Sequence, residues 1–155
     1  MQSKDNIKVA CVPPEMLGPM WPHIGPYLLR GQLEIAKGDL KTAMTELTVA
    51  LLAAQAGHVQ FWVVCDDDQK CAIAAMTSQI VEEDGKRVVW VTGMAGEDIL
   101  RWGGEMSDRM ADFAKEEGCR CYRFAGRAAL RRAYRDVRII GQHESGVHLF
   151  ERAVS

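Results

Sequence analysis

The stretch from Lys86 to Gly118 constrains the fold more than any other part of the chain. It opens with a β-branched and aromatic run, residues 88–92, which predicts a strand. The small residues 93–96 predict a turn, and a helix is expected from Glu97, because acidic side chains suit the positive end of a helix dipole. Apolar residues then recur every three or four positions, so one face of this helix can pack on a sheet.

The junction of this strand, turn and helix predicts an anion site. A helix N-terminus that follows a glycine turn presents free backbone N–H groups at one point, and these groups favour a pyrophosphate or another anion. No other stretch of the sequence points as directly to chemistry.

Two adjacent glycines, Gly103 and Gly104, lie inside the predicted helix. Each costs on the order of 1 kcal/mol relative to alanine in a helix interior. Either the helix is broken there, or a neighbouring backbone or side chain packs closely against it.

The bulk composition predicts one globular domain over residues 1–155. The chain is 48% hydrophobic and 26% charged, which is ordinary for a globular protein, and its net charge of −2 argues against a general nucleic-acid binder. Arginines crowd the C-terminal end after Cys119. This basic end predicts contact with phosphates or an acidic partner, or simply a solvated helix face.

The five cysteines are an odd number and include no C-x-x-C pair, which predicts buried thiols in a reducing compartment. No metal site is expected, because no histidine lies near them at ligand spacing. The acidic triplet 66–68 predicts a solvated turn. No apolar run reaches the roughly 20 residues that cross a bilayer, and residues 1–6 lack a signal-peptide pattern.

The remaining patterns predict a mixed α/β fold. Strands are expected at residues 7–12, 61–65, 71–81, 87–92, 120–125, 137–141 and 147–153, and helices at 15–37, 42–56, 97–118 and 128–135. The order is β-α-α-β-β-β-α-β-α-β-β. Three strands joined by tight turns are expected to be antiparallel, and the helical crossover then adds a parallel neighbour.

This order resembles the GNAT fold of acyl-CoA-dependent N-acetyltransferases, over nearly the whole chain. The resemblance implies acetyl-CoA as the cofactor of an active protein. It places the pyrophosphate on the backbone of one segment, made of Thr92, Gly93, Met94, Ala95, Gly96 and Glu97. The segment departs from the family pattern R/Q-x-x-G-x-G/A in its glycine spacing, and it lacks the basic or amide residue.

The same resemblance implies a role for Tyr134. A tyrosine on the short helix after the fifth strand often serves as general acid to the departing thiolate in active members, because its hydroxyl can donate a proton. The alternative is that the Tyr134 ring packs under the last hairpin. Three residues near predicted strand ends, Glu83, Asp66 and His58, are candidate bases, and each also suits a turn.

A narrower resemblance rests on short motifs. Residues 21–24 (WPHI), residues 61–66 (FWVVCD), Gly118-Cys119 and Gly126-Arg127 look like a group of GNAT-like proteins encoded among bacteriophage structural genes, some of them called internal virion proteins. This resemblance implies a bacteriophage protein located in the virion or the host cytoplasm. Its expected partners are other virion proteins or further copies of itself.

Three functional hypotheses follow. The first is a virion or assembly component with a degenerate cofactor site, which the altered segment favours. The second is an active N-acetyltransferase that uses acetyl-CoA on an amine of a small molecule or protein, which the complete topology and Tyr134 favour. The third is a host-directed binding module that uses the arginine-rich end.

Overall fold

The computed structural model describes residues 6–127, 130, 132–142 and 147–154. The chain forms two compact units that interleave along the sequence. The first comprises residues 1–78 and 92–98, and the second comprises residues 79–91 and 99–155. Two long strands, β3 (Cys71–Glu83) and β4 (Lys86–Gly96), contribute to both units.

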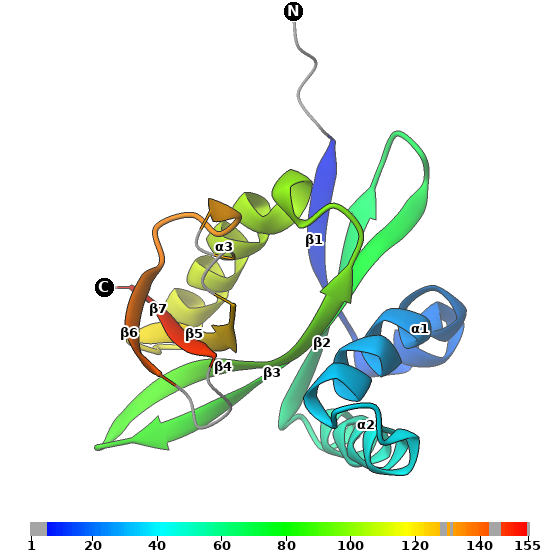
Figure 1. Ribbon diagram of the computed structural model, residues 1–155, viewed down its shortest axis with the longest axis horizontal. Coiled ribbons are helices and arrows are strands. Elements are labelled where there is room, and N and C mark those ends of the chain that lie inside the picture. The colour runs from blue at the N-terminus through cyan, green and yellow to red at the C-terminus, as the bar shows by residue number, and fades with distance from the viewer. Residues whose placement is uncertain (1–5, 128–129, 131, 143–146, 155) are drawn as a thin grey trace, which may run out of the picture. The chain divides into compact units, whose positions relative to one another are not determined.

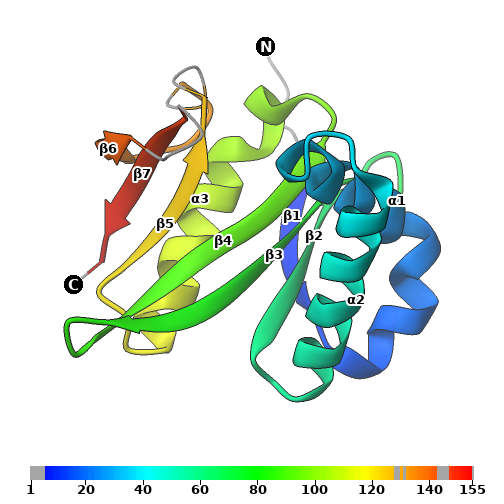
Figure 2. The ribbon, with the colours of Figure 1, turned by 60° about the horizontal axis from the view of Figure 1, so that its bottom comes forward.

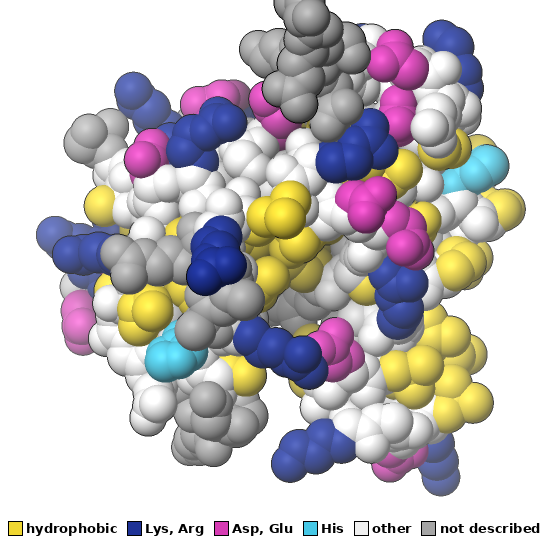
Figure 3. All heavy atoms as spheres, turned by 45° about the horizontal axis from the view of Figure 1, so that its top comes forward, with side chains coloured by type: hydrophobic (Ala, Val, Ile, Leu, Met, Phe, Trp, Pro, Cys, Tyr) yellow, Lys and Arg dark blue, Asp and Glu magenta, His cyan; other side chains and the backbone are white. Residues whose placement is uncertain are grey.

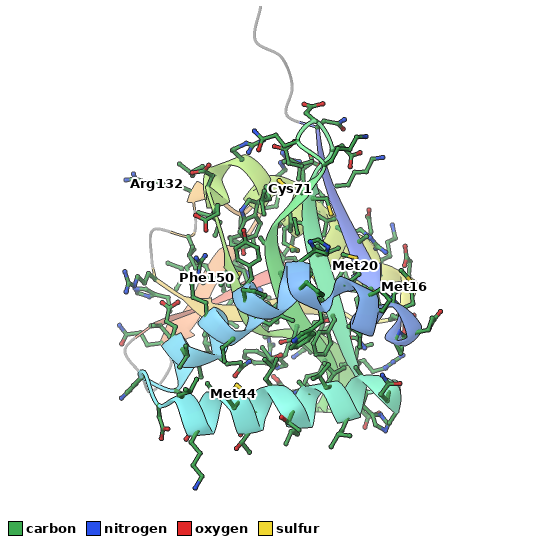
Figure 4. All side chains as sticks on the ribbon, turned by 90° about the vertical axis from the view of Figure 1, so that its right-hand side faces the viewer. Met16, Met20, Met44, Cys71, Arg132 and Phe150 are labelled. Carbon is green, nitrogen blue, oxygen red and sulfur yellow. The ribbon has the colours of Figure 1, made fainter. Side chains whose placement is uncertain are left out.

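The first unit pairs two strands and packs two helices together. It contains β1 (Ile7–Val12), a 3-10 turn (Pro14–Met16), α1 (Leu17–Ile35), α2 (Leu40–Gln55) and β2 (Val59–Asp66). Strand β1 runs antiparallel to β2, and α1 lies beside α2 (Figures 1 and 4). Apolar side chains of β1, α1, α2 and β2 meet in one core around Ile24, Leu47 and Phe61.

The second unit is built around a long helix. It contains α3 (Ile99–Glu116), β5 (Cys121–Gly126), β6 (Arg138–Gln142) and β7 (His148–Ala153). Strand β5 is parallel to β4 and antiparallel to β7, which it adjoins in Figure 2. Its core places Met106 and Met110 of α3 with the aromatic residues Tyr122, Phe124 and Phe150.

The strands form one seven-stranded mixed sheet in the order β1-β2-β3-β4-β5-β7-β6. The predicted mixed fold is therefore confirmed, including the parallel neighbour created by the helical crossover. A tight turn joins β3 to β4 through Asp84 and Gly85, which both have positive φ angles of 53° and 75°. Two such residues in succession suit a two-residue hairpin connection.

Several predicted boundaries need correction. Strand β4 continues to Gly96, so residues 93–96 are not the predicted turn. Helix α3 starts at Ile99, and it has no acidic residue in its first turn. Helix α1 runs from Leu17 to Ile35, inside the predicted range 15–37, and it includes Pro22 and Pro26. Of the predicted helix at 128–135, the residues 128, 129 and 131 lie outside the described residues, and the turn 143–146 of the last hairpin does too.

None of the helices in the described part of the chain is both long and apolar enough to span a bilayer.

Candidate functional site

The segment predicted to hold the pyrophosphate is the end of strand β4. Only Glu97 and Asp98 separate β4 from α3, so no glycine-rich loop connects them. Asp98 takes up a positive φ of 51° in this short connection. The family resemblance implied a loop whose glycines let the backbone approach a phosphate, whereas here the glycines belong to a strand.

The two glycines of the segment face other parts of the same unit. A Cβ atom on Gly96 would lie 2.3 Å from the Cβ of Ala74, and one on Gly93 would lie 2.7 Å from the side-chain amide nitrogen of Gln32. The backbone of Met94 is also covered, because a Cβ on Gly31 of α1 would lie 3.0 Å from the Met94 carbonyl oxygen. Close packing on β3 and α1 therefore accounts for the small residues.

The polar groups of the segment also have partners inside the first unit. The Glu97 N–H donates to the Ile73 carbonyl at 2.8 Å. Arg30 donates to the Gly96 carbonyl at 2.9 Å, and it pairs with the Glu97 carboxylate at 3.2 Å. The Thr92 hydroxyl lies 2.8 Å from that of Thr77.

These contacts do not fit a pyrophosphate cradle on residues 92–97. A cradle needs open N–H donors, yet the Glu97 donor is used within the fold and its carboxylate adds negative charge. Binding of a cofactor at these residues stays a prediction.

Tyr134 lies in the second unit and packs into its aromatic core. It is 4% exposed, its ring centroid lies 4.6 Å from that of Phe124, and Trp102 meets it edge-on at 6.5 Å. Burial raises the pKa of its hydroxyl far above the ordinary value of 10. The ring is therefore buried, but these ring contacts are with β5 and α3, whereas the alternative placed it under the last hairpin. Its role as a general acid stays a prediction.

A shallow cavity of about 320 Å³ adjoins Tyr134 on the surface of the second unit. Arg101 and Gly104 of α3 line it on one side, and Arg132 and Arg135 line it on the other.

A buried polar network connects the segment around Arg135 to α3. It was not predicted from the sequence. The Ser107 hydroxyl donates to the Arg135 carbonyl and shares a short hydrogen bond with the Tyr122 hydroxyl. Arg152 donates to Ser107 at 3.1 Å and pairs with Asp108 at 2.8 Å. Burial raises the pKa of Tyr122 to about 12. No motif pointed to these residues, because they come from α3, β5, β7 and the segment before β6.

The arginines of the C-terminal end are largely paired with acids. Arg123, which is buried, contacts Glu83 at 2.5 Å and Glu151 at 2.8 Å. Arg138 also contacts Glu151 at 2.9 Å, and Arg120 contacts Glu83 at 3.4 Å. Figure 3 shows basic side chains beside acidic ones on the face in view. The predicted basic end is thus much less positive than its composition suggests.

The candidate bases lie in structural positions. The buried Asp66 accepts hydrogen bonds from the backbone N–H groups of Asp68 and Gln69, which fixes the turn after β2. The turn predicted for the acidic triplet is present, but it begins at Asp67, because Asp66 is the buried last residue of β2. A hydrogen bond from Arg123 lowers the pKa of Glu83, and His58 is an exposed residue just after α2. Within the described residues, no group of three His, Cys, Asp or Glu side chains can hold a metal ion.

Searches by sequence found neither a matching family model nor a matching curated protein. Solved structures do match the fold. A Streptococcus pneumoniae acetyltransferase of the GNAT family superposes with a TM-score of 0.61 at 13% identity, over 97% of this chain and 100% of its own.

Two further structures agree. The Salmonella typhimurium acetyltransferase that modifies the N-terminal serine of ribosomal protein L7/L12 has a TM-score of 0.58 at 11% identity, over 99% and 97% of the two chains. A predicted acetyltransferase from Clostridium acetobutylicum, solved with acetyl-CoA, has a TM-score of 0.54 at 15% identity, over 83% and 86%. The fold of this chain is that of the GNAT acetyltransferases.

Proposed function

We propose that the chain is a GNAT-fold protein that works as a binding or assembly component, with its cofactor segment given over to internal packing. The observation that carries this proposal is that residues 92–97 use their small side chains and backbone groups in contacts within the first unit. Gly96 lies against Ala74, and the Glu97 N–H is bonded to the Ile73 carbonyl. A protein that no longer binds a cofactor at this segment is free to use these groups for stability.

The surface of α2 supports a binding role. Four large apolar side chains of this helix are half or more exposed, namely Leu40, Met44, Val49 and Leu52. Lys41 and Glu46 are its only charged residues. An exposed helix face with so few charges is typical of a surface that a partner covers.

The kind of assembly follows from the narrower resemblance alone. The motifs around Trp21, Phe61 and Gly118 imply a bacteriophage protein whose partners are virion proteins or further copies of itself. The comparisons with solved structures concern acetyltransferases, so the virion role rests on those motifs.

The second candidate function is an acetyl-CoA-dependent N-acetyltransferase, and the fold comparisons favour it. The match covers 99% of this chain in an acetyltransferase that modifies the N-terminal serine of a ribosomal protein. Under this candidate the substrate is an amine of a protein or small molecule. Residues other than 92–97 would have to supply the donors for the pyrophosphate.

Isothermal titration with acetyl-CoA, and separately with CoA, distinguishes the two candidates. The assembly role predicts no saturable binding up to millimolar ligand. The Salmonella enzyme of the same fold, titrated in parallel, is the positive control. Micromolar binding by this chain would overturn the proposal and establish the second candidate as the better account.

A further inference from the structure

We propose that the second unit carries a binding site for a carboxylate group on a short apolar stem. The site is a cavity of about 370 Å³ beside strands β5, β6 and β7. The residues that line it are Arg120, Cys121, Arg123, Arg138, Ile140, Glu151 and Ala153. It lies entirely within one unit, and neither the assembly role nor an acyl transfer makes use of it.

The charges around the cavity leave a surplus of donors. Three guanidinium groups, of Arg120, Arg123 and Arg138, face two carboxylates, of Glu83 and Glu151. Each guanidinium has five N–H donors, whereas a carboxylate has about four acceptor positions. The cluster therefore keeps one net positive charge and several unused donors.

The unused N–H donors belong to the two outer arginines of the cluster, Arg120 and Arg138. Arg138 has a side chain that is 69% exposed, and among the described residues its one recorded partner is Glu151. Arg120 makes a single long contact, 3.4 Å to Glu83, and its buried Nε–H has no acceptor within the described part of the chain. That Nε–H is closed to the cavity, but the terminal N–H groups of both side chains are not. An oxyanion in the cavity would accept from these unused donors.

The inner arginine is already satisfied. Arg123 is buried and contacts both carboxylates at 2.5 and 2.8 Å. It contacts Glu83 and Glu151, and these two carboxylates in turn contact Arg120 and Arg138 beside the cavity. A guanidinium group matches the geometry of a carboxylate, which can accept two parallel N–H bonds.

Apart from the arginines and Glu151, the lining carries no charge. Ile140, Ala153 and the thiol of Cys121 provide a surface that cannot bind further charge. The Cys121 thiol is itself directed to the Glu151 carboxylate at 3.5 Å. The ligand class is therefore an organic acid with a short apolar stem, either a free acid or the C-terminal carboxylate of a peptide.

Titration of the ¹⁵N-labelled full chain with butyrate tests the site by NMR. The Nε–H signals of Arg120 and Arg138 are expected to shift with saturation. Butyramide, which has the same stem without charge, and inorganic phosphate, which has charge without a stem, are expected to bind at least tenfold more weakly. A tripeptide ending in leucine with a free carboxylate, compared with its amide, distinguishes a protein C-terminus from a free acid as the source.

Two variants locate the binding. Arg138→Gln is expected to weaken butyrate binding at least tenfold, while Glu151 keeps its contact with Arg123 and the fold is retained. Arg127→Gln removes the same charge from an exposed position outside the cavity, and it is expected to leave binding unchanged. Equal losses in both variants, or no saturable shift at Arg120 and Arg138, would overturn the proposal.

Discussion

A Cβ atom on Gly103 would lie only 2.5 Å from the carbonyl oxygen of Ala133. The helix α3 is continuous at this point, so the glycine marks a close approach between two backbones. The neighbouring Gly104 differs, because its nearest atom is the flexible guanidinium end of Arg135 at 2.8 Å. Of the two explanations offered for this glycine pair, close packing is therefore correct.

Gly103→Ala is expected to destabilise the protein by about 1–3 kcal/mol, because overpacking against a backbone outweighs the gain in helix propensity. Gly104→Ala is the matched control. The Arg135 side chain can move aside, so the change is expected to be neutral or to stabilise by up to about 1 kcal/mol. Urea unfolding of both variants measures the difference. A Gly103→Ala protein as stable as Gly104→Ala would contradict the close contact.

Gly96→Ala tests whether this glycine serves packing. The added methyl group would meet the Cβ of Ala74, and a loss of about 1–3 kcal/mol is expected. Gly93→Ala is the control, since the Gln32 side chain can rotate away. The double variant Gly96→Ala with Ala74→Gly is expected to recover part of the loss. Thermal unfolding without recovery in the double variant would show that Ala74 is not the obstacle.

The five cysteines are expected to differ in reactivity. Burial and the nearby Glu151 carboxylate raise the pKa of Cys121 to about 11, so its thiol stays protonated at pH 8. Cys11 and Cys71 are exposed, so the prediction of buried thiols is wrong for these two. Iodoacetamide labelling followed by peptide mass spectrometry is expected to modify Cys11 and Cys71 first. Rapid labelling of Cys121 in the folded protein at pH 8 would contradict the raised pKa of this thiol.

Stability is expected to depend on the Glu151 carboxylate. Burial acts to raise the pKa of Glu151, but hydrogen bonds from Arg138 and Arg123 outweigh it and lower the pKa below the ordinary 4.5. A carboxyl group with a lowered pKa contributes stability above the unfolded value, and this contribution is lost as the pH falls through the folded value. Acid therefore weakens this contribution.

Glu151→Gln is expected to cost on the order of 3 kcal/mol at pH 7, because it removes one partner of a buried pair. The difference from the wild type is expected to shrink as the pH drops below about 4.5. Denaturant unfolding between pH 3 and 7 measures it. A difference that stays constant with pH would show that the ionised carboxylate is not what stabilises the fold.

Much of the fold could be predicted from local patterns. Strand β1 was predicted at its exact limits, and β-branched runs identified the other strands to within a few residues. The N-cap of α2 shows what local patterns leave open, because Asp39 accepts from the Thr42 N–H and moves the start of the helix to Leu40. Errors of one or two residues at the ends of a helix are common, because its limits depend on one or two hydrogen bonds.

The candidate site could not be predicted in the same way. Residues 93–96 have the composition of a turn, yet packing on Ala74 and α1 keeps them in a strand. Tertiary contacts override such local preferences. The pairs of Arg123 with Glu83 and Glu151 join residues that are 40 and 28 positions apart, and no periodicity connects them.

The backbone amide of Glu97 offers the most direct test of the central claim, that this segment serves the fold and not a cofactor. Its N–H is bonded to Ile73, so ¹H–¹⁵N spectra are expected to show slow hydrogen exchange at Glu97 and no shift when millimolar acetyl-CoA is added. Fast exchange at Glu97, together with a saturable shift on addition of acetyl-CoA, would contradict the account.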